Sequence, residues 1–228
     1  MKNLKILYVF GFILILQGCA YYPQLTDIPL ISEKGDLQVD AGITTCITAN
    51  VTASYGLTDK IALQVFGSIV NGYYFQAAAG PYKKLKNGSI LELYNGIGYG
   101  YGDAYNDANP GHLSGNYQVV FSQLNYGVTN RSFLNSDLGI SLKTGYMHSY
   151  MKDDNYYDIY SYDPYRQVDF IRDHSILLEP TAFWRFGGKN LKFGIKAGTV
   201  LFYEFTSQNK SFPVGPLNIG MSLSYRFK

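Results

Sequence analysis

The feature that most constrains the fold is an alternation of apolar and polar residues with a period of two, which begins at Asp36 and recurs to the C terminus. Successive side chains of a β-strand point to opposite faces, so this period predicts strands with one apolar and one polar face. The last segment is the clearest, and its apolar face consists of Leu217, Ile219, Met221, Leu223, Tyr225 and Phe227. Repetition of the pattern predicts an all-β, antiparallel barrel of about ten strands over residues 36–228, with eight or twelve as alternatives.

Charge distinguishes the two faces of the expected strands. The apolar faces hold no Asp, Glu, Lys or Arg, whereas the polar faces hold Asp36, Asp40, Lys60, Glu92, Lys143, Glu179, Arg185, Lys192, Lys196, Glu204 and Arg226. A basic side chain that faces lipid at the bilayer midplane costs about 2–4 kcal/mol, so lipid-facing positions should lack charge. The pattern therefore favours a transmembrane barrel. The alternative is a soluble, lipocalin-like barrel, in which the apolar faces point inward.

Two local features depart from plain alternation. Apolar residues change parity within residues 116–127, and a bulge near Ser122–Gln123 would restore the pattern. The run GIGYGYG at 96–102 places glycine at every second position with no helix after it, so it lacks the context of a dinucleotide-binding loop. We expect these glycines to let aromatic neighbours such as Tyr94 lie flat across the barrel interior.

Composition supports strands and narrows the function. The 228 residues include 22 Tyr, 14 Phe and 24 Gly, which is typical of many short strands rather than helices. A net charge of +2 with 16% charged residues argues against nucleic acid as a partner. Three His and two Cys without metal-ligand spacing predict no metal site, and we expect no cofactor.

Connections of two lengths alternate along the chain. Brief ones are expected at 57–59, 84–87, 130–137 and 187–189, and longer ones at 102–114, 151–169 and 207–213. Transmembrane barrels have short periplasmic turns and longer extracellular loops, so we expect the longer set outside the cell. With ten strands, both ends of the barrel fall on the rim of the short turns.

The N terminus reads as an export signal that ends in a lipidation site. Residues 1–18 join Lys2 and Lys5 to an apolar stretch that is short for a membrane-spanning helix. Leu16-Gln17-Gly18-Cys19 then matches a bacterial lipobox, which makes Cys19 the expected lipidated residue; a plain signal peptide is the alternative. Residues 19–35 are expected to form a lipidated periplasmic tether. Because no acidic cluster follows Cys19, we expect the lipid in the periplasm-facing leaflet.

Several stretches resemble small outer-membrane β-barrel lipoproteins of Bacteroidota: ASYGLTDKIAL, LELYNGIGYGYG, HSILLEPTAFWRFG and the closing SYRF. The resemblance covers roughly residues 36–228 and consists of strand and turn patterns. It implies a barrel in the outer membrane, in contact with its lipid, and no particular activity. The chain departs from outer-membrane barrels in general at its end, where Lys228 follows Phe227.

Enzymatic and pore functions are the alternatives to a structural role. Asp153-Asp154, Asp173-His174 and His148-Ser149 hold residue types used by outer-membrane proteases and lipid-modifying enzymes. Neighbours on a strand diverge, however, and no third orienting group is evident, so no catalytic residue is predicted. A wide pore is disfavoured because barrels of about eight strands are filled by side chains, whereas open channels need 16 to 18.

The longest expected loop carries the most suggestive surface. Its segment KDDNYYDIYSYDPYR, residues 152–166, combines acidic residues with five tyrosines, and Tyr offers a large contact area at low entropic cost. The candidate partner contacts are Tyr156, Tyr157, Tyr160, Tyr162 and Tyr165. We therefore expect a non-enzymatic barrel that serves as a structural or accessory subunit of a larger outer-membrane assembly, with other outer-membrane proteins as partners.

Overall fold

The computed structural model describes residues 19–46, 48–70, 72–106, 111–131, 133–155, 168–205 and 213–227. Its strands are β1 (Leu37–Thr44), β2 (Ala49–Gly56), β3 (Ile61–Val70), β4 (Gly72–Lys84), β5 (Ser89–Asn106), β6 (Gly111–Arg131), β7 (Ser136–Asn155), β8 (Val168–Gly187), β9 (Leu191–Thr199), β10 (Leu201–Glu204) and β11 (Leu217–Phe227). A short 3-10 helix, η2 (Phe133–Asn135), joins β6 to β7. Among the described residues, no helix has the length and apolarity needed to cross a membrane.

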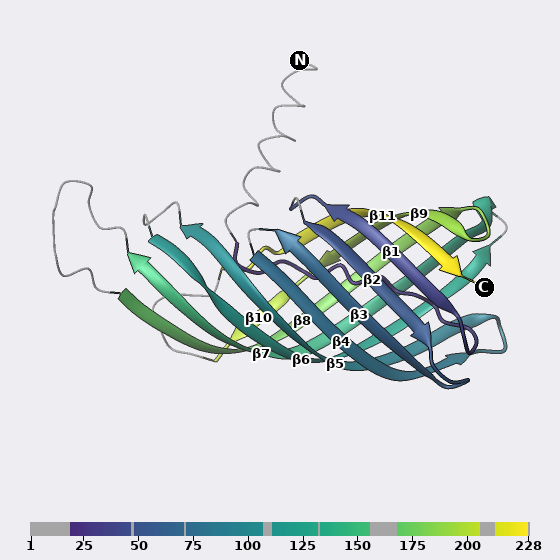
Figure 1. Cartoon of the computed structure of the whole chain (residues 1–228), viewed down its shortest axis with the longest axis horizontal. Coiled ribbons are helices and arrows are strands. Elements are labelled where there is room, and N and C mark those ends of the chain that lie inside the picture. Colours follow the sequence, from purple (N-terminus) through teal and green to yellow (C-terminus); the bar gives the residue numbers. More distant parts are fainter. Residues whose placement is uncertain are drawn as a thin grey trace, which may run out of the picture.

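The strands form one closed antiparallel barrel (Figure 1). Each strand pairs with its neighbour in sequence from β1 to β8, and β11 pairs with both β1 and β9. Only Val200 separates β9 from β10, and both pair with β8, so together they occupy one position in the wall. The wall therefore has ten strand positions. This confirms the predicted all-β antiparallel barrel and its strand number.

The two rims of the barrel differ in their connections. The short-turn rim carries residues 57–60, 85–88, 133–135 and 188–190, together with the start of β1 and the end of β11, where Leu37 pairs with Phe227. The other rim, called the long-loop rim below, is where β1, β3, β5, β7 and β10 end and where β2, β4, β6, β8 and β11 begin. On this side the wall is taller from β5 to β8, since these strands have 18 to 21 residues against 8 in β1 and β2.

The alternation in β6 runs through the position where a bulge was expected. Ser122 and Gln123 pair in unbroken register with both β5 and β7, so that prediction is wrong. The register shifts only near the short-turn rim, between Val128 and Arg131. The parity of the apolar residues changes because Val119 and Phe121 point into the lumen, where they are buried. The apolar side chains of β6 therefore face the lumen in one part of the strand and the outer surface of the barrel in another.

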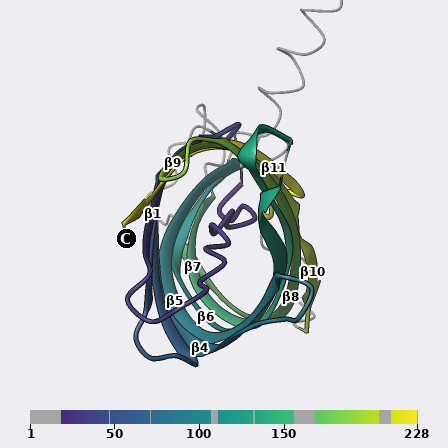
Figure 2. The same cartoon turned by 90° about the vertical axis from the view of Figure 1, so that its right-hand side faces the viewer.

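The N-terminal segment lies inside the barrel. Residues 20–31 are buried apart from Gln24, and Figure 2, which looks in from the short-turn side, shows the purple chain within the ring of strands. Residues 19–32 are called the plug segment below. Within the expected periplasmic tether of residues 19–35, the structure thus places residues 20–31 in the lumen. The physical reason is the apolar content of the segment, which includes Leu25, Ile28, Leu30 and Ile31, all at most 2% exposed.

Candidate functional site: the plugged lumen

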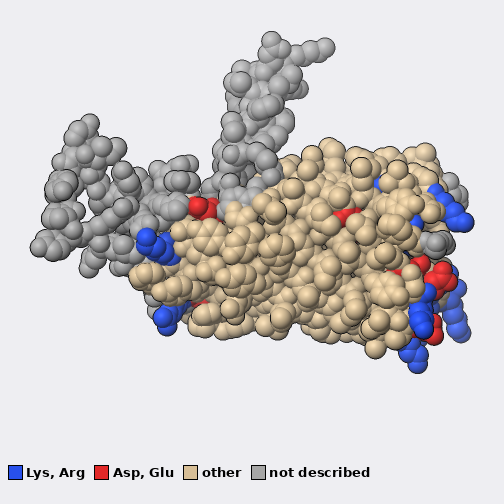
Figure 3. All heavy atoms as spheres, viewed as in Figure 1, with Lys and Arg blue, Asp and Glu red and all other residues tan. Residues whose placement is uncertain are grey.

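The outer surface of the barrel is apolar between its two ends. Large hydrophobic side chains point outward from every wall strand that spans the middle, for example Val65, Phe75, Ile97, Ile140 and Leu223, each 53 to 66% exposed. In Figure 3 the Lys, Arg, Asp and Glu atoms gather at the two ends, and the visible middle is almost free of them. An apolar surface of this extent is not found on soluble monomers. It is the distribution expected for a barrel that contacts lipid, not for a lipocalin-like one.

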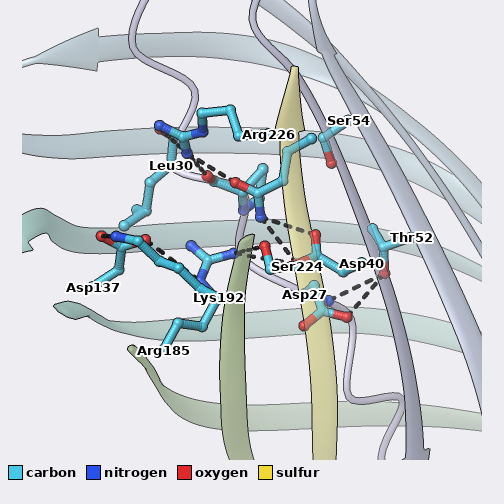
Figure 4. Close-up of polar contacts among 12 residues, drawn as sticks. Asp27, Leu30, Asp40, Thr52, Ser54, Asp137, Arg185, Lys192, Ser224 and Arg226 are labelled. Atoms are coloured by element: carbon cyan, nitrogen blue, oxygen red, sulfur yellow. Dashed lines mark hydrogen bonds and ion pairs between the residues drawn. The ribbon is translucent and has the colours of Figure 1, made fainter. Parts of the chain in front are cut away.

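The lumen near the short-turn rim holds a chain of ion pairs (Figure 4). Lys192 Nζ donates to Asp137 Oδ1 at 2.6 Å, and Arg185 lies between two carboxylates, 3.7 Å from Asp137 Oδ2 and 3.4 Å from Asp40 Oδ1. All four side chains are at most 7% exposed. They come from β1, β7, β8 and β9. The ion pairs of Arg185 therefore connect β8 both to its neighbour β7 and to the more distant β1. Buried charges are tolerated when each has a partner of opposite sign.

The middle of the lumen binds the plug through Lys196. Its ammonium donates to Asp27 Oδ2 at 2.7 Å, to the backbone oxygen of Leu25 at 2.8 Å and to Asn50 Oδ1 at 3.1 Å. Thr52 Oγ1 donates to the same Asp27 carboxylate at 3.3 Å. The side chains of Lys196 and Asp27 are 2% and 4% exposed. The ion pair thus fixes the plug to the wall, since neither charge has access to bulk water.

A second cluster holds the plug farther along the lumen. Tyr21 Oη donates to Glu179 Oε1 at 2.7 Å, and Lys143 Nζ lies 3.3 Å from Glu179 Oε2. Lys143 also donates to Gln76 Oε1 at 3.1 Å, while Gln76 Nε2 donates to Thr26 Oγ1 at 3.1 Å. These contacts bring residues from β4, β7 and β8 onto one side of the plug. Some of the inward charges that the sequence pattern indicated, among them Glu179 and Lys196, are therefore partners of the N-terminal segment.

The end of the plug nearest the short-turn rim is held by backbone contacts. Arg226 Nη2 donates to the backbone oxygens of Pro29 and Leu30 at 2.7 and 3.3 Å. Glu92 Oε1 accepts from the backbone N–H of Ile31 at 2.7 Å, and Asn125 Nδ2 donates to its other oxygen at 3.0 Å. Hydrogen bonds to charged groups typically contribute about 1.5–3 kcal/mol each. Main-chain recognition of this kind specifies the path of the segment.

Small residues in the wall make room for the plug and for lumen aromatics. A Cβ atom at Gly102 would overlap the backbone of Ala20, and one at Gly198 would overlap Leu25. Gly98 lies against the ring and hydroxyl of Tyr74. The glycines at 96–102 therefore do make room for aromatic rings, as predicted. The rings come from neighbouring strands, however, such as Tyr74 of β4 and Tyr117 of β6.

Two small cavities lie beside the plug and at the short-turn rim. A cavity of about 30 Å³ lies between Cys19, Asn50, Ser68 and Tyr117, among other residues. A second, of about 40 Å³, lies at the short-turn rim beside Asp137, Lys192 and Arg226. A buried water needs about 10–15 Å³ of such space, so each cavity has room for two or three waters.

The structure separates the residue pairs considered above as types found in enzymes. Asp173 is 2% exposed and points inward, whereas His174 is exposed on the outer face and stacks on His148 with 4.8 Å between ring centroids. Ser149 and Ser175 also point inward, away from the two histidines. Within the described ranges, no group of three or more His, Cys, Asp or Glu is placed to hold a metal ion.

Of the other residues predicted from the sequence, Cys19 lies within the described part of the chain and the loop tyrosines do not. Cys19 is half-buried, and its backbone N–H donates to Tyr22 Oη at 3.3 Å. The five tyrosines Tyr156, Tyr157, Tyr160, Tyr162 and Tyr165, and the expected signal peptide 1–18, lie outside the described residues. The plug contacts were missed at the sequence level. The signal that could have revealed them is the cluster of apolar residues Leu25, Ile28, Leu30 and Ile31 in a segment expected to be a tether.

Comparison with solved structures gives matches at low sequence identity, two of which are described here. The KdgM porin in complex with disordered oligogalacturonate aligns with a TM-score of 0.37 and 13% identity, over 85% of this chain and 99% of that one. Omp33, an outer membrane protein of Acinetobacter baumannii, aligns with a TM-score of 0.35 and 8% identity, over 86% and 98%. No protein family and no curated protein matches the sequence.

Proposed function

We propose that this protein is an outer-membrane β-barrel whose lumen is closed by its own N-terminal segment. Its role in this proposal is structural or accessory, within a larger outer-membrane assembly, and involves neither catalysis nor solute diffusion. The outward apolar surface supports the membrane location. The observation that carries the proposal is the plug, because contacts from Lys196, Glu179 and Arg226 hold it at successive levels of the lumen.

Conductance measurements test whether the plug closes the barrel. In planar bilayers we expect the purified full-length protein to give no stable conductance steps. A variant lacking residues 20–32, or the milder variant in which Ile28, Leu30 and Ile31 are replaced by Ser, should give discrete open steps. Leu57→Ser, in an exposed turn of the short-turn rim, is the control and should remain silent. Steps of equal size in the wild type and the deletion variant would show that the lumen conducts past the plug.

We also propose the lipid anchor and the family indicated by the sequence. In this proposal Cys19 is the first residue of the mature chain and carries the acyl anchor, as in small outer-membrane barrel lipoproteins of Bacteroidota. A clickable fatty acid fed to cells should label the wild type, and Cys19→Ala should abolish the label. Cys46 is a suitable control, because Cys46→Ala should leave the labelling unchanged.

The connection between β7 and β8, within the loop expected at 151–169, is the proposed contact surface for a partner in the outer membrane. Replacing its five tyrosines Tyr156, Tyr157, Tyr160, Tyr162 and Tyr165 by Ser should leave heat-modifiable migration intact and reduce partner recovery in a mild-detergent pull-down. A matched control replaces outward tyrosines of the wall, such as Tyr73 and Tyr99, by Phe. Unchanged recovery in the loop variant would exclude these tyrosines as the contact surface.

A further inference from the structure

The plug segment crosses the lumen from one rim to the other. Its N-terminal end lies at the rim opposite to the one where β1 begins. At the short-turn rim the chain enters the barrel next to the β2 end, where Gly35 N donates to the backbone oxygen of Gly56 at 2.8 Å. At its other end, the backbone N–H groups of Ala20 and Tyr21 donate to the Pro213 oxygen at 3.0 and 3.2 Å. Pro213 belongs to the β10–β11 connection, which lies on the long-loop rim.

Contacts on other sides of the barrel place Cys19 at the same rim. The cavity beside Cys19 is also lined by Thr44 and Thr48, which flank the β1–β2 connection, and by Gly72 at the β3–β4 connection. Asn218 at the start of β11 completes this side. All four positions lie at the long-loop rim, at a strand end or in the β1–β2 connection. Cys19 is therefore bounded at this rim from several directions.

The N-terminal part of the plug also pairs with the β10–β11 connection through the backbone, as a strand would. Tyr21 forms a parallel bridge with Val214, and Gly215 N donates to the Tyr21 backbone oxygen at 2.8 Å. Gly215 lies against the ring of Tyr22, where a larger side chain would not fit. The exit of the segment is thus recognised through its backbone and through a close ring contact.

We infer that the mature N terminus emerges on the side of the long loops, so that a group attached to Cys19 lies in the leaflet on that side. The inference rests on the proposed function, in which the long loops face the cell exterior and Cys19 carries acyl chains. It assigns the anchor to the outer leaflet in place of the periplasm-facing one expected from the sequence. The lumen then serves as the passage through which the lipid-bearing end of the chain reaches the cell surface.

The test uses a short protease-cleavable epitope inserted into the full-length protein at one of three places. The first lies between Cys19 and Ala20, the second between Asn87 and Gly88 in a turn of the short-turn rim, and the third after Asp158 in the long loop. A protease that cannot cross the outer membrane is added to intact or permeabilised cells. We expect cleavage of the first and third epitopes on intact cells, and of the second only after permeabilisation.

The outcomes separate the route of the plug from the orientation of the barrel. If the first epitope, like the second, is cleaved only after permeabilisation while the third is cleaved on intact cells, the plug does not cross the lumen and the inference is overturned. If the first and third are cleaved together only after permeabilisation, the route holds and the proposed orientation fails.

A disulfide probe tests the same route without an insertion. In a Cys46→Ser background, Tyr21→Cys with Val214→Cys should form a disulfide on mild oxidation, because these residues form a backbone bridge. Tyr21→Cys with Asn87→Cys, at the opposite rim, is the matched control and should remain reduced. Two free thiols in the first variant, with a disulfide in the second, would place the N terminus at the short-turn rim.

Discussion

At the scale of single residues, the ion pair between Lys196 and Asp27 has the clearest energetic consequence. Breaking a buried pair by removing one partner costs about 3–5 kcal/mol, because the remaining charge has no compensation. We expect Lys196→Met to lower the temperature at which the folded band disappears in heat-modified electrophoresis. The double variant Lys196→Met with Asp27→Leu should recover much of the loss, since neither charge remains. Lys189→Met, on the exposed rim, is the control; equal effects of the two single Lys variants would contradict a role for the pair.

Cys46 offers a second residue-level prediction, on pH dependence. Burial raises the pKa of this thiol to about 11, so at neutral pH the reactive thiolate is roughly a hundredfold scarcer than for an ordinary cysteine. Alkylation by a maleimide in the folded protein should therefore be slow at pH 7 and accelerate as the pH rises toward 11. Unfolded protein should react quickly at pH 8.5 and, with Cys19 acylated, take one label per chain. Rapid labelling of the folded protein at pH 7 would show that Cys46 is accessible.

At the scale of elements, the sequence predicted the strands well and the plug poorly. Period-two alternation located the wall because each strand carries its own pattern, independent of distant residues. The plug has no such period, and its partners are remote in sequence: Asp27 binds Lys196, which is 169 residues away. The change of parity in β6 was misread as a bulge for the same reason. Tyr117 packs edge-on against Tyr21 at 5.4 Å, so its inward position depends on the plug.

The packing of β5 against lumen aromatics gives a prediction at this scale. Gly98→Ala would push its new Cβ into the Tyr74 ring, and overpacking of this kind costs about 1–3 kcal/mol. We expect lower thermal stability of the folded band, with recovery when Tyr74→Leu is added. Gly67→Ala is the matched control, because its nearest neighbour is the exposed Phe75 ring, which can move. A stable Gly98→Ala variant would mean that Tyr74 has another position available.

At the scale of the whole molecule, the barrel reverses the arrangement of a soluble protein. Several buried charges are paired within the lumen and with the plug, while its outer wall is apolar between two charged ends. This arrangement is stable only if lipid covers the wall. Ile97→Arg or Ile195→Arg, each on the outer face, should therefore reduce assembly into membranes, with a cost of about 2–4 kcal/mol at the bilayer midplane. Leu57→Arg should be tolerated, since this exposed residue lies in a turn at the short-turn rim. Membrane fractionation and heat-modifiable migration measure the outcome. Equal assembly of the three variants would mean that the apolar wall is covered by protein instead of lipid.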